Sequence, residues 1–211
     1  MTARDTTPPR RRDFSIPGDP GVELFVREVR AGAAPRGGVV LLHGARGPGL
    51  ASFDLDVPGG SLAADLARAG YAAYVMDARG YGGSTRPPEM AQAPQAHPPL
   101  VRSAEVVRDV AAVVAWVARH AGVARVALLG WATGGLWLGH YATLYPGLIS
   151  HLVAYNTLYG NVAEHPSLGR GSGLEDPQRP GHFAAAGTGA YRFNTAASLL
   201  PAWDTSIPIA D

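Results

Sequence analysis

The sequence predicts an α/β protein built on a mostly parallel sheet with helices on both faces. Short unbroken apolar runs bounded by glycine recur along the chain, which is typical of strands that are covered on both sides. Segments with helical spacing of apolar residues separate these runs. Strands that alternate with helices in this way form parallel sheets.

Five strands are predicted. The first alternates apolar and polar residues, as a half-exposed strand does. The other four are apolar runs. In chain order the strands occupy Val22–Val29, Gly37–Gly44, the segment that begins at Tyr71, Val126–Gly130 and the segment from Leu148 to Thr157.

Three helices lie between these strands. Ser61 is placed to cap the first helix, and Gly70 to end it. Ser103 opens the second, whose valines form one apolar stripe until Gly122. The third is predicted for Leu136–Tyr145, before Pro146.

The chain is expected to have three parts. Residues 1–20 are basic and proline-rich and predict a flexible tail. Residues 21–157 hold the strand–helix core, interrupted by a proline-rich loop at 85–100. Residues 158–211 contain no further buried strand and predict a cap or lid segment that is incomplete, with the last strands of the sheet missing.

The composition of the chain limits the classes of partner and cofactor that are expected. The formal net charge is +1, so neither nucleic acid nor a membrane surface is an expected partner. Cysteine is absent and the N-terminus lacks the apolar stretch of an export signal, which favours a cytoplasmic protein. No nucleotide fingerprint or metal-ligand spacing occurs, so we expect no cofactor and no metal.

Three glycine-containing segments follow successive predicted strands. They are "HGARGPG" within Leu42–Gly49, "DARGYGGS" at Asp77–Ser84 and "GWATGG" at Gly130–Gly135. The carboxyl ends of parallel strands are where open α/β sheets bind ligands. The third segment has the glycine spacing of the G-x-S-x-G corner that exposes a nucleophile, but Ala132 occupies the central position.

Together these segments resemble the α/β-hydrolase superfamily over Val22–Thr157. The resemblance implies that Ala132 stands at the nucleophile position, and we expect serine there in the natural enzyme. It also implies an oxyanion hole formed by the backbone N–H groups of Ala45 and Thr133. Trp131 and Arg46 are candidate substrate-binding residues. The implied partner is a small acyl substrate, as in an esterase or thioesterase.

Other polar residues near these segments are expected to be structural. His43 is predicted to be a buried histidine that bonds loop backbone, and Asp77 and Arg79 to tie down the loop after their strand. Asp54 and Asp56 are interpreted as a solvated pair in a long loop.

The family's chain order places the catalytic acid and histidine after later strands. His165 and His182 lie in Gly- and Pro-rich sequence and are not expected to be the general base. We therefore expect both partners beyond Asp211, in a missing C-terminal segment that would also cover the exposed strand near Leu152.

The main interpretation is a serine hydrolase in a Ser-to-Ala, inactive and C-terminally incomplete form. Two alternatives remain. One is a natural non-catalytic homologue that uses the pocket to bind a ligand, with Ala132 native. The other is a hydrolase for epoxides or haloalkanes whose nucleophile at position 132 is aspartate.

Overall fold

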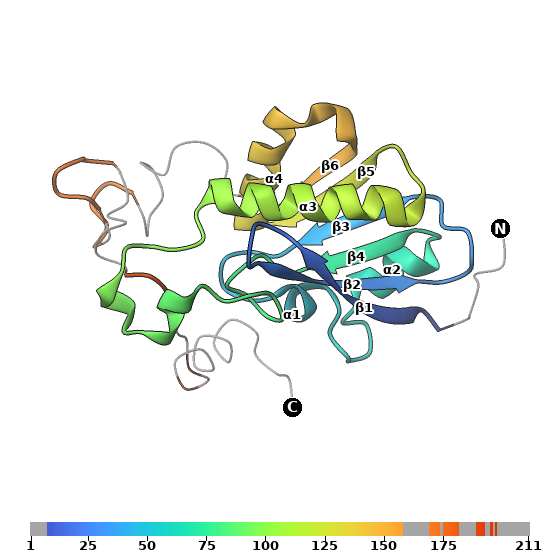
Figure 1. Ribbon diagram of the computed structural model, residues 1–211, viewed down its shortest axis with the longest axis horizontal. Helices are drawn as coiled ribbons and strands as arrows, with labels where there is room; N and C mark the ends of the chain where they lie inside the picture. The colour runs from blue at the N-terminus through green and yellow to red at the C-terminus, as the bar shows by residue number, and fades with distance from the viewer. Residues whose placement is uncertain are drawn as a thin grey trace. The chain divides into compact units, whose positions relative to one another are not determined.

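The computed structural model describes residues 8–157, 169–173, 175–181, 189–192, 195 and 197 (Figure 1). The chain divides into two compact units. The first comprises Met1–Pro87 and Val101–Gly160, and the second Pro88–Leu100 and Asn161–Asp211. The proline-rich loop therefore groups with the C-terminal segment rather than with the core. The cap predicted for residues 158–211 lies mostly outside the described residues.

The first unit contains a six-stranded sheet of order β1-β2-β4-β3-β5-β6. The two strands at one edge pair antiparallel, and β4, β3, β5 and β6 are parallel. This confirms the predicted mostly parallel sheet. The strands are β1 (Arg10–Pro17), β2 (Glu23–Arg30), β3 (Gly38–Leu42), β4 (Ala72–Met76), β5 (Val126–Trp131) and β6 (Ile149–Tyr155).

The helices are α1 (Gly49–Phe53), α2 (Leu62–Arg68), α3 (Ser103–Ala121) and α4 (Thr133–Leu144), with short 3-10 turns at Pro88–Ala91 (η1), Pro94–Ala96 (η2) and Pro146–Leu148 (η3). The three predicted helices are present as α2, α3 and α4, of which α4 begins at Thr133 and not at Leu136, and the short helix α1 was not predicted. Ser61 caps α2, since its Oγ accepts the Ala64 N–H at 2.9 Å. Gly122 ends α3 in the left-handed conformation. None of the helices within the described residues is both long and apolar enough to cross a bilayer.

The expected N-terminal tail is wrong for Arg10–Pro17, which forms β1 and pairs with β2 along its whole length. Alternate side chains explain why this basic segment is ordered. Phe14 packs on Trp116 with ring centroids 4.8 Å apart. On the other face, Asp13 accepts two hydrogen bonds from Arg27. Cross-strand charge pairing of this kind stabilises an edge strand.

Asp54 is also not the solvated residue that was expected, because its side chain is fully buried. Its carboxylate accepts hydrogen bonds from Arg11 and from Ser61 Oγ, the latter at 2.6 Å. Burial alone would raise the pKa of Asp54, but these hydrogen bonds outweigh it and hold that pKa below its ordinary value. Asp54 thereby links β1 to the start of α2.

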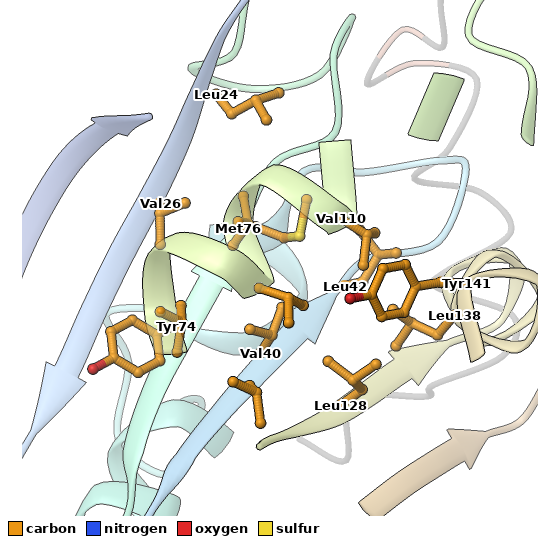
Figure 2. Packing of buried hydrophobic residues seen from close by; sticks show 14 of the residues in the cluster. Leu24, Val26, Val40, Leu42, Tyr74, Met76, Val110, Leu128, Leu138 and Tyr141 are labelled. Carbon is orange, nitrogen blue, oxygen red and sulfur yellow. The ribbon is translucent and has the colours of Figure 1, made fainter. Parts of the chain in front are cut away.

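The sheet carries an apolar cluster on each face. One cluster packs the sheet against α3 and α4, and Figure 2 shows part of it, with Val110 from α3 and Leu138 from α4 meeting the strand residues Val40 and Leu128. The second cluster, which includes Val75 and Ala67, packs the opposite face against α1 and α2. Helices therefore cover both faces, as predicted for this class.

Removing the hydroxyl group of Tyr141 is expected to stabilise the core. Its side chain is fully buried on α4 (Figure 2), and its hydroxyl finds no hydrogen-bond partner in the described structure. Burial raises its pKa to about 12. An unsatisfied buried polar group costs about 1 kcal/mol or more. Tyr141→Phe should therefore raise the free energy of unfolding in urea by about 1 kcal/mol.

The matched control is Tyr74→Phe, because the buried Tyr74 hydroxyl donates to Glu28 Oε1 at 3.0 Å. That substitution should lower the free energy of unfolding by a similar amount, since it removes one of the two hydrogen bonds to the buried Glu28 oxygen and leaves only that with His120 Nε2. Equal losses for the two variants would show that Tyr141 has a partner after all.

The far edge of the sheet is open to solvent in the described structure. β6 has exposed or half-exposed residues throughout, including Leu152 (42% exposed), Val153 (48%) and Tyr155 (63%). An exposed apolar edge strand invites pairing with further polypeptide. The prediction that the strand near Leu152 is uncovered is therefore correct for the described residues.

Candidate active site

The corner between β5 and α4 has the geometry of a strained elbow. β5 ends at Trp131 and α4 begins at Thr133, so Ala132 alone makes the turn. Its backbone has φ 50° and ψ −119°. A residue other than glycine adopts positive φ at a cost of about 1–3 kcal/mol, which is found where the surrounding structure imposes it. Figure 1 shows the corner at the end of β5, where the chain turns into α4.

Glycines allow the elbow to be this tight. A Cβ added to Gly130 would lie 2.5 Å from the Gly135 nitrogen, and one added to Gly134 would overlap the carbonyl oxygens of Leu42 and His43. The start of α4 thus packs directly on the ends of β5 and β3. The spacing of these glycines in the sequence is explained by close backbone approach.

The loop after β3 meets the elbow. A Cβ on Gly44 would lie 3.3 Å from Ala132 Cβ and 3.9 Å from the Thr133 nitrogen. Ala45 follows at once and is exposed. The hydrogen bonds of the described loops and caps engage neither the Ala45 N–H nor the Thr133 N–H. Two free amides therefore lie on adjoining segments, although their convergence on one point stays a prediction.

His43 is structural, as the sequence suggested. It is fully buried, its Nε2 accepts the Ala78 N–H at 3.1 Å, and its Nδ1 then donates to Gly44 O at 2.7 Å. Burial lowers its pKa and favours the neutral ring. Because both nitrogens are engaged, His43 holds the loop beside the elbow and has no free nitrogen with which to accept a proton.

Asp77 and Arg79 tie down the loop after β4, also as predicted. The Asp77 carboxylate accepts the N–H groups of Gly49 and Gly83, at 2.6 and 2.9 Å. The Arg79 guanidinium donates to Asp109, with a shortest distance of 2.6 Å, and to Asp19. Burial by itself would lower the pKa of Arg79, and these hydrogen bonds raise it above its ordinary value.

The two predicted substrate-binding residues flank the same edge of the sheet. Trp131 ends β5 and is 36% exposed. Arg46 is exposed in the turn after β3 and forms no ion pair with the described part of the chain, so its charge is available to an anionic group. No contact shown by the structure joins either side chain to the elbow. His165 and His182 lie outside the described residues.

Among the residues that the structure describes, neither a metal site nor the cavity of the structure adds to the elbow. Within the described residues no group of three or more histidine or carboxylate side chains could hold a metal ion. A cavity of about 330 Å³ lies away from the elbow, around the loop at residues 55–61. Its lining places Arg11 and Arg68 with Asp56 and Asp65, so it has no preference for one sign of charge and we give it no role.

Asn156 is a candidate site residue that was not predicted from the sequence. This residue follows β6 directly, beside the elbow, and has φ 45°. The available signal was a polar residue at the end of a predicted strand, which is where ligands bind in such sheets.

Comparison with known proteins agrees with this geometry. The family model described as "alpha/beta hydrolase fold" matches residues 38–198. A search of curated proteins found no match. Among solved structures, the chain is similar to an esterase from Exiguobacterium antarcticum, with 19% identity and a TM-score of 0.54 over 75% of this chain and 50% of that one.

Two further structures are similar. One is a "predicted CIB-like hydrolase" from Thermoplasma acidophilum, with 18% identity and a TM-score of 0.51 over 72% of this chain and 65% of that one. The other is DcsB in complex with a substrate analogue, with 16% identity and a TM-score of 0.58 over 74% of this chain and 48% of that one. Such identities show a shared fold alone, and the chain spans from 48% to 65% of these proteins. By the family match over most of its length and the strained elbow at Ala132, the chain belongs to the α/β-hydrolase fold family.

Proposed function

We propose that the active form of this protein is a serine hydrolase for an ester, thioester or related acyl substrate, with serine at position 132. The observation that carries the proposal is the backbone of Ala132, a strained corner at the carboxyl edge of the sheet. Such strain has little reason to persist unless the exposed side chain at its tip has a use. Alanine has no nucleophilic atom, so the present chain is the inactive form.

In the active form, the serine Oγ would attack the acyl carbonyl carbon and lose its proton to a general base. The carbonyl oxygen would become an oxyanion, stabilised by the N–H groups of Thr133 and Ala45. Collapse of this intermediate would release the alcohol or thiol with the proton from the base and leave an acyl-enzyme. Water would then release the acid and restore the serine.

The general base and its acid are proposed to come from polypeptide beyond Asp211. His43 is excluded because Ala78 and Gly44 occupy both of its ring nitrogens. The family's order of residues puts the acid and the histidine after later strands. The exposed edge of β6 is the place where such strands would pair. A non-catalytic ligand-binding protein is the second candidate, favoured by alanine itself at position 132.

Binding at the elbow is testable without catalysis. In the 211-residue chain labelled with ¹⁵N, methyl butyrate should shift the amide signals of Thr133 and Ala45 as its carbonyl oxygen accepts their hydrogen bonds. Gly44→Val should weaken this binding at least about tenfold, because even the Cβ would lie 3.3 Å from Ala132 Cβ and leaves no room for the acyl group.

Gly47→Val is the matched control. Gly47 lies in the same loop, and a Cβ there would meet nothing within 4 Å. This variant should bind methyl butyrate as the unmodified chain does. If the ester leaves both amides unshifted, or if the two valine variants behave alike, the oxyanion hole is not where we place it.

A further inference from the structure

Asn156 lies beside the nucleophile position. Trp131 pairs with Tyr155 in the parallel register of β5 and β6, and the Ala132 N–H donates to Tyr155 O at 3.0 Å. Neighbouring strands are roughly 4.8 Å apart. Asn156, the next residue, is therefore about one strand spacing from the elbow, at the edge where open α/β sheets bind their ligands.

The backbone at Asn156 is constrained. Within the described residues, only Val101, Ala132 and Asn156 combine a side chain with positive φ, and two of these three stand at adjacent strand ends. The following residue, Thr157, packs so closely on Gly135 that a Cβ on the glycine would overlap the Thr157 side chain. This contact fixes the end of β6 against the first turn of α4. Constrained conformations of this kind cluster at ligand sites.

The side chain of Asn156 is exposed and makes no hydrogen bond within the part of the chain that the structure describes. A carboxamide offers two N–H donors and one acceptor oxygen. Successive residues of a strand alternate between the faces of the sheet, so Leu152 and Ala154 of β6 share the alternation of Asn156, and both are exposed and apolar. Asn156 is thus an uncommitted polar group on an otherwise mainly apolar surface next to the elbow, which is the usual arrangement of a group that selects ligands.

We propose that Asn156 sets substrate specificity by hydrogen bonding to a hydroxyl group on the acyl chain, one or two carbons from the scissile carbonyl. The inference rests on the proposed function, because it takes the carbonyl to lie at the elbow. The side chain of Asn156 and a hydroxyl group one or two carbons from the scissile carbonyl are together long enough to bridge one strand spacing, roughly 4.8 Å. The preferred substrates are therefore hydroxyacyl esters or thioesters rather than plain acyl ones.

The test compares methyl 3-hydroxybutyrate with methyl butyrate by NMR titration of the 211-residue chain. The hydroxyester should bind about three- to tenfold more tightly, as expected for one hydrogen bond, and should shift the side-chain amide signals of Asn156. Asn156→Gly removes the carboxamide while suiting the positive φ, and it should abolish the preference. Asn156→Asp keeps an acceptor for the hydroxyl and should retain it.

His151→Ala is the control, because His151 is exposed at the other end of β6 and should leave the preference unchanged. Equal affinity for the two esters in the unmodified chain overturns the inference. A preference for the hydroxyester that survives in Asn156→Gly overturns it as well. In both cases the proposed function stands if the esters still shift the amide signals of Thr133 and Ala45. If neither ester shifts those two amides, the proposed function fails and the inference fails with it.

Discussion

Asp109→Ala is expected to lower the free energy of unfolding by about 3–5 kcal/mol. Asp109 lies on α3, is fully buried, and accepts both the side-chain and the backbone N–H groups of Arg79, at 2.6–3.1 Å. Without it, the guanidinium of Arg79, a residue only 6% exposed, is left with Asp19 alone for hydrogen bonds among the described residues, and because Asp19 is shared with Arg108, much of the buried charge is uncompensated. An uncompensated buried charge is among the most destabilising changes in a core.

Urea denaturation measures the loss, and Asp65→Ala is the matched control. Asp65 is also a helical aspartate bonded to an arginine, Arg68, but both side chains are more than half exposed. Its removal should cost about 0.5 kcal/mol or less. The double variant Asp109→Leu/Arg79→Met should recover most of the stability, because it removes both charges together. Similar losses for Asp109→Ala and Asp65→Ala would show that the buried pair adds nothing.

The parts of the fold that the sequence predicted are those decided by local pattern. Buried parallel strands such as β3 and β4 are continuous apolar runs, and the valine stripe of α3 has a clear helical period. The elbow was predictable because close backbone approach requires glycine at Gly130 and Gly134. These signals need no knowledge of distant residues.

The parts that the sequence did not predict depend on contacts between distant segments. β1 looks like a basic tail until Arg11 meets Asp54 across 43 residues of sequence and Asp13 meets Arg27 on the next strand. The burial of Asp54 follows from the same contacts. Asn156 was missed because its place beside Ala132 depends on the pairing of β6 with β5, which no local pattern reports.

Ala132→Ser is expected to give at most residual hydrolysis in the 211-residue chain and strong activity in a chain that continues past Asp211. Serine adds one oxygen at a position whose backbone is already set, so the elbow should accept it. A serine hydroxyl is a weak nucleophile until a histidine takes its proton and a carboxylate orients that histidine. Oxyanion stabilisation and binding alone leave about a thousand- to ten-thousandfold acceleration over water.

The longer chain should exceed the short one by about ten-thousandfold or more in kcat/KM. Both would be assayed with p-nitrophenyl acetate and titrated with an active-site phosphonate, and each would be compared with its own Ala132 form, which lacks any nucleophile there. If serine leaves the longer chain inactive although it folds and binds methyl butyrate, the protein is the ligand-binding homologue. If the short Ala132→Ser chain matches the long one, the base lies within residues 1–211. His165 or His182, the histidines that follow β6 in the sequence, would then be the general base that we place beyond residue 211.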